Sequence, residues 1–164
     1  MSAHEIYAPF YSVESNDRYE VISKLGEGTF GEVRKARDRH TGEFVAVKRV
    51  RLLAKRGQNT LPKAIFREIQ ALKQLSDDPH IISLLDVYGD DMSVCLVTPL
   101  MIHDISEVIT YSEPFIPVPE LKCYFWMMLK AVAHCHSHGI IHRDIKPSSK
   151  SHHYHIHIFL KLNI

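Results

Sequence analysis

The sequence has little of what marks secreted, membrane or fibrous proteins. It holds only three cysteines among 164 residues, none in a C-x-x-C pair, which argues against a disulfide framework and for a reducing compartment. No uninterrupted apolar run approaches the length of a membrane span, and the first residues lack the basic-then-apolar form of a secretory signal. We therefore expect a cytoplasmic and/or nuclear protein without a membrane partner.

Net charge is also nearly absent. Twenty Lys and Arg residues stand against 19 Asp and Glu residues, a balance of +1, so nucleic acid is not an expected partner. What the chain does have is an average globular composition, with 45% hydrophobic and 24% charged residues. It also has 12 histidines, several of them crowded near the C-terminus. Its length suffices for one ordinary domain or for part of a larger one.

Hydrophobic periodicity divides the chain into four parts. Residues 1–18 show no clear period and are interpreted as an irregular lead-in. Residues 19–98 predict five strands with one inserted helix, and residues 99–149 predict a mainly helical segment with a long helix from Glu120 to about His138. Residues 150–164 form a tail of different character. The fold class predicted is α+β, a small lobe joined to the beginning of a second one.

Three local predictions concern the small lobe. Residues 32–39 are ambiguous between helix and strand, because they contain several good helix formers. The inserted helix is expected to be capped by Thr60, with Pro62 in its first turn, and to be stopped by Asp77-Asp78-Pro79. Residues 81–88 and 93–99 are predicted to form a hairpin.

A glycine motif, Gly26-x-Gly28-x-x-Gly31, follows the first predicted strand. Alone it is weak, since dinucleotide-binding proteins use the same spacing. That interpretation needs an acidic residue about 20 positions further on, and none occurs between Glu43 and Glu68. Here Val33 and then Val45-Ala46-Val47-Lys48 follow the glycines instead. This combination is typical of protein kinases, where glycine lets backbone approach phosphate closely.

A second motif, His142-Arg143-Asp144-Ile145-Lys146-Pro147-Ser148-Ser149, resembles the catalytic loop of protein kinases. With both motifs in the right order, the chain resembles the eukaryotic Ser/Thr protein kinases from about Tyr19 to Ser148. The resemblance implies a kinase small lobe at 19–98, with a five-stranded antiparallel sheet and one helix. It also implies a hinge, the start of an incomplete helical large lobe and the catalytic loop at 99–149.

The resemblance also implies an ATP site. Its members would be Leu25, Gly26, Glu27, Gly28, Thr29, Phe30, Gly31, Val33, Ala46, Lys48, Thr98, Met101 and Asp104. Val33 and Ala46 would sandwich adenine, and Lys48 would hold the α- and β-phosphates with Glu68 as its ion-pair partner. Thr98 would be the gatekeeper. The Pro99 carbonyl and Met101 amide would meet adenine at the hinge, and Asp104 would reach the ribose.

The remaining implied roles concern catalysis and regulation. Asp144 would accept or orient the substrate hydroxyl proton, and Lys146 would neutralise the transferring phosphate. The segment Pro62–Glu68 is similar to the cyclin-binding helix of cyclin-dependent kinases, in the cell-cycle-related and CDK-activating branch. This similarity implies a cyclin-like regulatory subunit and protein substrates. Thr29 stands where these kinases take inhibitory phosphorylation, whereas Phe30 replaces the neighbouring tyrosine.

The chain departs from the family after the catalytic loop. Ser149 replaces the asparagine that would bind magnesium, and no Asp-Phe-Gly occurs, so no metal ligand is assigned although ATP and Mg are the family's cofactors. His134, His136 and His138 are expected to spread around a helix rather than to bind metal. The tail has the character of a misjoined reading frame, such as retained intron sequence; sequencing the transcript tests this hypothesis.

Three interpretations follow. The gene product is a cyclin-dependent-type kinase that moves the ATP γ-phosphate to protein Ser/Thr; or this chain is a non-catalytic short form that binds nucleotide or cyclin as a competitor; or it is a gene-model artefact. In each, the chain itself should transfer phosphate negligibly. Its long helix carries an apolar stripe at Leu121, Phe125, Met128, Val132 and Cys135, and exposure of this stripe predicts an aggregation-prone fragment.

Overall fold

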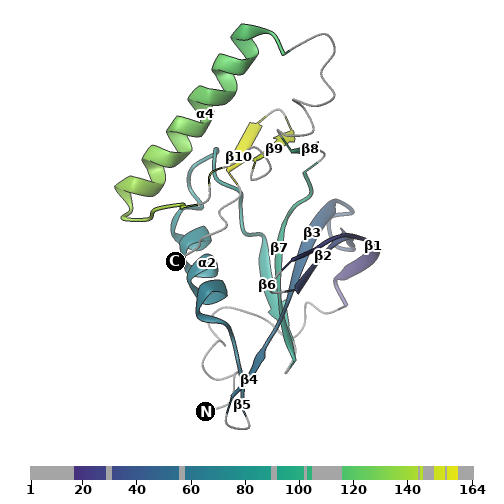
Figure 1. Ribbon diagram of the computed structural model, residues 1–164. Coiled ribbons are helices and arrows are strands. Elements are labelled where there is room, and N and C mark those ends of the chain that lie inside the picture. The colour runs from purple at the N-terminus through teal and green to yellow at the C-terminus, as the bar shows by residue number, and fades with distance from the viewer. Residues whose placement is uncertain are drawn as a thin grey trace. The chain divides into compact units, whose positions relative to one another are not determined.

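The computed structural model describes residues 17–28, 31–55, 58–89, 92–101, 103–104, 116–143, 145, 150–153 and 155–158. The chain divides into two compact units (Figure 1). The first comprises Met1–Phe66 with Leu84–Leu100, and the second comprises Arg67–Ser83 with Met101–Ile164.

The first unit is built on a five-stranded antiparallel sheet, which confirms the predicted fold class. The strands are β1 (Tyr19–Gly28), β2 (Gly31–Asp38), β3 (Phe44–Arg51), β6 (Asp86–Gly89) and β7 (Ser93–Pro99), in the order β1-β2-β3-β7-β6. The ambiguous stretch 32–39 is mostly strand β2. Pairing with β1 on one side and β3 on the other satisfies its backbone, so tertiary context overrides the helix propensity of its residues.

One face of this sheet carries a buried apolar cluster. Tyr19 of β1 stacks on Tyr88 of β6 with ring centroids 5.3 Å apart, and the aliphatic members come from β2, β3 and β7. The full cluster is Tyr19, Ala36, Val45, Val47, Tyr88, Cys95 and Val97. Because all five strands contribute residues to the cluster, its packing stabilises the sheet as a whole.

Two boundary predictions were wrong. Thr60 does not cap the helix, because it lies in β5 (Gln58–Thr60), which pairs with β4 (Leu53–Lys55). The helix α2 begins at Lys63 and ends at Gln74, and the Pro62 carbonyl accepts bonds from the amides of Ile65 and Phe66 at 3.0 and 3.1 Å. A small hairpin, β4–β5, therefore precedes the helix.

The second wrong boundary lies after α2. The strand expected over 81–88 is present only as β6, from Asp86. Ile81 and Ile82 are consecutive and both buried, whereas a strand with one buried face alternates buried and exposed residues. They form a buried segment outside the sheet.

The second unit contains the predicted long helix, α4 (Val118–Ser137). Pro117 precedes it at the N-cap position, and Gly139 follows it with φ of +72°, a left-handed conformation that glycine adopts without steric cost. The tail forms β9 (Lys150–His153) and β10 (His155–Ile158), which join β8 (His103–Asp104) in a sheet of order β10-β9-β8. The helix α4 makes contacts with β10.

The apolar stripe expected on α4 is exposed near the start of the helix and buried nearer its end. Met128 and Cys135 are buried together with Met127 and Ala131, whereas Leu121 and Phe125 are 48% and 58% exposed. Val118, Trp126 and Leu129 are exposed as well. The exposed apolar surface of α4 therefore includes two residues of the predicted stripe, Leu121 and Phe125. Its other three residues lie outside that stripe. Within the described part of the chain, no helix is long and apolar enough to cross a membrane.

Candidate functional site

The strand register brings several predicted nucleotide-binding residues to one face of the sheet. Val33 of β2 lies opposite Lys48 of β3, and Ala46 of β3 lies opposite Thr98 of β7. Directly opposed residues of antiparallel strands project to the same side, as do residues two apart on one strand. Val33, Ala46, Lys48 and Thr98 therefore share a face. The buried apolar cluster, which contains the intervening Val47, occupies the other face.

The glycine motif lies at the closed end of the β1–β2 hairpin. Its last member, Gly31, has no room for a side chain, because a Cβ there would stand 1.9 Å from the carbonyl oxygen of Arg49 in β3. Gly26 is different: no atom of the described residues lies within 4 Å of the place its Cβ would take. The fold thus requires glycine at position 31, whereas packing among described residues does not require it at position 26.

Two neighbouring side chains of β1 are open to solvent. Leu25 is exposed, and its place in a nucleotide site stays a prediction. Glu27 lies 2.6 Å from the ammonium of Lys24, measured from Oε2 to Nζ. This hydrogen bond, together with the lysine charge, lowers the pKa of the Glu27 carboxyl. Glu27 is therefore a fixed negative charge at the edge of the hairpin.

The open end of the same hairpin is closed by a polar clasp. The Arg18 guanidinium donates from Nε and from one terminal nitrogen to both oxygens of Asp38, at 3.0 and 2.6 Å. The Tyr19 hydroxyl donates to Asp86 on β6 at 3.1 Å. These bonds, which sequence reasoning missed, tie β1 to both β2 and β6. They hold the base of the hairpin whose tip carries the glycine motif.

The predicted partner of Lys48 is buried. Glu68 on α2 is 5% exposed, in a row otherwise made of apolar residues such as Ile65 and Ile69. A buried carboxylate is costly unless another group compensates its charge. Lys48 is half-buried on β3. The Lys48–Glu68 ion pair stays a prediction.

Several predicted site residues lie outside the described residues. These are Thr29, Phe30, Asp144, Lys146 and Ser149. Gly28 and Asp104 are described by their backbone, at the end of β1 and in β8, where Asp104 pairs with Ser151. Met101 follows β7 as a half-buried residue.

The residue before Asp144 has an unusual backbone conformation. Arg143 has a φ of +62°, in the left-handed region that residues other than glycine seldom adopt. The preceding His142 is buried. Strain of this kind costs about 1–3 kcal/mol and concentrates at functional sites. Nothing in the sequence distinguished Arg143 by conformation; only the motif around it drew attention to this segment.

No metal site accompanies these residues in the described part of the chain. There, no group of three or more His, Cys, Asp or Glu side chains is arranged to hold a metal ion. In the sequence given, Asp-Phe-Gly does not occur and Ser149 stands where the family has an asparagine. The nucleotide site on the face around Lys48 stays a prediction.

Comparison with known proteins places this geometry in a family. The protein kinase domain family matches residues 19–149, so the match ends where the tail begins. Cyclin-dependent kinase 20 of Danio rerio is 39% identical over 133 residues, which cover 81% of this chain and 38% of the relative. The Homo sapiens protein of that name is 35% identical over the same length, with the same shares. The chain therefore spans about 38% of the length of these relatives. The similarity to cyclin-dependent kinases expected from the sequence is confirmed, and the chain belongs to the protein kinase domain family.

Proposed function

We propose that the chain is the ATP-binding part of a cyclin-dependent-type serine/threonine protein kinase. The observation that carries the proposal is the shared face of Val33, Ala46, Lys48 and Thr98, bordered by the glycine hairpin. Small and β-branched side chains beside a lysine offer an apolar surface to a base and a positive charge to phosphates. Localisation in the cytoplasm or nucleus is part of the proposal.

Each residue of the face receives a role from its chemistry. Val33 and Ala46 contact the adenine ring, and Thr98, which is buried, limits the depth of the pocket beside it. The Lys48 ammonium binds the α- and β-phosphates, and Glu68 orients it. The backbone of Pro99 and Met101 bonds the adenine edge, the Gly26–Gly31 hairpin covers the phosphates, and Asp104 binds the ribose.

The catalytic loop supplies the groups that would act on the acceptor. Asp144 accepts or orients the proton of a Ser/Thr hydroxyl, and Lys146 offsets negative charge on the transferring phosphate. The sequence given contains no Asp-Phe-Gly, whose aspartate is the family's main magnesium ligand. Each loss of about 1.4 kcal/mol of transition-state stabilisation lowers the rate tenfold. We therefore expect nucleotide binding without appreciable transfer by this chain. The rate of phosphate transfer is measured with radiolabelled ATP and a protein substrate. Robust turnover by the 164-residue chain would refute this expectation.

We also propose a second candidate function, that of a non-catalytic short form. A chain that binds nucleotide or cyclin and cannot transfer phosphate would compete with a complete kinase. The proposed cyclin-like partner would bind the Pro62–Glu68 segment, where Lys63 and Arg67 are exposed and Ile65 is buried. The proposed regulation is phosphorylation of Thr29 in the glycine hairpin.

Titration of the chain with ATP tests the proposed site directly. Lys48→Met should weaken binding at least about tenfold, because it removes the cation from the phosphates. Lys63→Met, an exposed lysine on α2, is the matched control and should leave the affinity unchanged. Equal ATP affinity in wild type and Lys48→Met would contradict the proposal. Circular dichroism of both variants verifies that they fold alike.

A further inference from the structure

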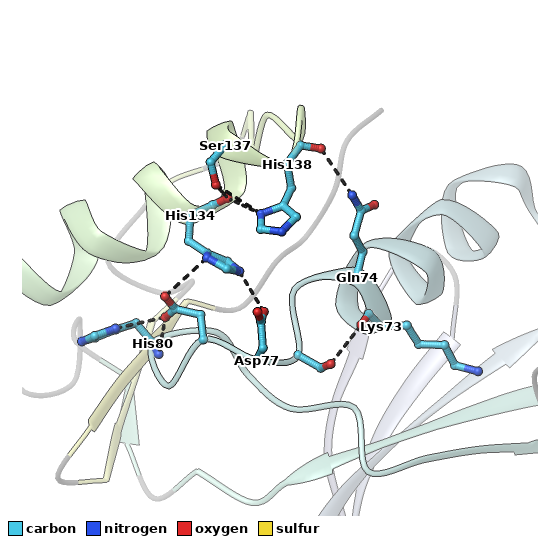
Figure 2. Close-up of polar contacts among 9 residues, drawn as sticks. Lys73, Gln74, Asp77, His80, His134, Ser137 and His138 are labelled. Atoms are coloured by element: carbon cyan, nitrogen blue, oxygen red, sulfur yellow. Dashed lines mark hydrogen bonds and ion pairs between the residues drawn. The ribbon is translucent and has the colours of Figure 1, made fainter.

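The helix α4 has an inner face that makes contacts within the second unit and an outer face that is open to solvent. At its last turns, His134 Nε2 is 3.1 Å from an oxygen of Asp77, and His134 Nδ1 is 3.6 Å from an oxygen of Asp78 (Figure 2). The Gln74 amide also donates to the His138 carbonyl oxygen at 3.5 Å. The buried residues of the helix are Met127, Met128, Ala131 and Cys135. These contacts leave the opposite side of α4 free to meet another molecule.

The outer face of α4 consists of two neighbouring rows of side chains, each with a spacing of four residues. One row is Leu121, Phe125 and Leu129, and the other is Val118, Lys122, Trp126 and Lys130. Rows of this spacing form ridges along a helix, with a groove between them. The structure has a groove here, with a volume of about 410 Å³, lined by Leu121, Lys122, Phe125, Trp126 and Leu129.

This outer face exposes a large apolar area. Its five apolar side chains are each 48–62% exposed. Since an aromatic side chain buries about 150–250 Å² when it is covered, the five together expose on the order of 500 Å². The largest apolar patch of a typical monomer is about 300–600 Å², and each partner of a stable interface contributes about 800 Å². The outer face therefore supplies more than half of what one side of a stable interface needs.

Lys122 sets the charge that a partner of this face must carry. It lies between Val118 and Trp126 in its row and lines the groove. None of the described residues supplies a carboxylate to it. Glu120, the one acidic residue of α4, belongs to neither row and accepts a hydrogen bond from the Tyr124 hydroxyl. A purely apolar partner would remove water from the Lys122 ammonium without compensating its charge, which is costly.

The remaining cation of the face lies beside its largest ring. The Lys130 ammonium is 5.0 Å from the centroid of the Trp126 ring. Both cations of the outer face therefore favour an acidic partner. The apolar residues alone allow weak, unspecific self-association, but the outer face of a second copy would bring another lysine to Lys122 instead of a carboxylate.

We propose that the outer face of α4 docks an amphipathic helix of another protein, one that presents an aspartate or glutamate among apolar residues. The apolar side chains of that helix fill the groove beside Phe125 and Trp126. Its carboxylate pairs with the Lys122 ammonium as water leaves the contact. Apolar anchors in a groove around a desolvated charge pair are the features that concentrate binding energy at interfaces. The docking does not depend on ATP.

Fluorescence tests the docking directly, because Trp126 is the only tryptophan of the chain. The probe is a synthetic, leucine-rich amphipathic helical peptide without tryptophan, with one glutamate at the centre of its apolar face. A second peptide carries glutamine there. Binding to the 164-residue chain should move the Trp126 emission to shorter wavelength, and the glutamate peptide should bind at least about fivefold more tightly than the glutamine peptide. Equal affinities, or no change in emission with either peptide, would overturn the proposal.

Variants of the chain separate the charge from the apolar contact. Lys122→Met should remove the preference for the glutamate peptide, whereas Lys63→Met, an exposed lysine of α2, is the control and should keep it. Leu129→Gln should weaken the binding of both peptides at least about tenfold. All three side chains are exposed, so these variants should fold like the wild type. A preference that survives Lys122→Met, or sedimentation showing that the emission change comes from pairing of two chains without peptide, would overturn the proposal.

Discussion

Asp38→Asn removes the charge from the clasp at the base of the β1–β2 hairpin. The Asp38 side chain is 6% exposed and receives both nitrogens of Arg18, whose own side chain is 31% exposed. Breaking a fully buried ion pair costs about 3–5 kcal/mol, and a charged hydrogen bond contributes about 1.5–3 kcal/mol. Because Arg18 keeps partial access to water, we expect a loss of about 2–3 kcal/mol in the free energy of unfolding.

Thermal unfolding followed by circular dichroism measures this loss. For a unit of this size each kcal/mol shifts Tm by about 4–8 °C, so a decrease of at least about 8 °C is expected at pH 7. Glu20→Gln is the matched control, because it removes the Glu20–Arg39 pair, in which the atoms are 3.7 Å apart and both side chains are more than half exposed. Such a pair contributes about 0–1 kcal/mol. Equal destabilisation by the two substitutions would refute the reasoning.

The pH dependence gives an independent check. The Arg18 guanidinium holds the pKa of the Asp38 carboxyl well below its ordinary value of 3.8. A carboxyl whose pKa is depressed in the folded state contributes stability that is present above its unfolded pKa and is lost as pH falls toward the folded one. The difference in stability between wild type and Asp38→Asn should therefore shrink below about pH 4. A difference that stays constant down to pH 2 would contradict the role of the charge.

Three further outcomes are expected. Gly31→Ala should lower Tm markedly, because its Cβ would meet the β3 backbone, whereas Gly26→Ala should leave Tm nearly unchanged. A larger decrease in Tm for Gly26→Ala than for Gly31→Ala would contradict the pairing register of β2 and β3. Phe125→Gln should reduce self-association measured by light scattering without lowering Tm, since the ring is exposed. Unchanged self-association would show that the exposed apolar surface of α4 does not cause it. Iodoacetamide at pH 7.5 should modify exposed Cys123 and spare Cys135, whose thiol pKa burial raises to about 11; rapid modification of Cys135 in the folded chain would be inconsistent with its burial.

Elements with strong local signals were predicted well, and those decided by pairing were not. The apolar spacing of Ile65, Ile69 and Leu72 predicted α2, and all three residues are buried. Thr60 carried an equally good capping signal, but its pairing with Leu53 in the β4–β5 hairpin took precedence. Propensity describes what a segment does alone, whereas a strand partner distant in sequence supplies hydrogen bonds that no local pattern reveals.

The order and spacing of residues alone determined which protein family this chain resembles. The glycine motif, the strand lysine and the catalytic-loop aspartate each lie in a short sequence that can be recognised without a structure. Only the tertiary structure decided which side chains meet. The register set Val33 opposite Lys48, the clasp joined Arg18 to Asp38, and packing of α4 beside the turn after α2 placed His134 between two carboxylates. The physical reason is distance along the chain: electrostatic and hydrogen-bonding partners act through space, and folding brings together groups whose separation in sequence carries no sign of their contact.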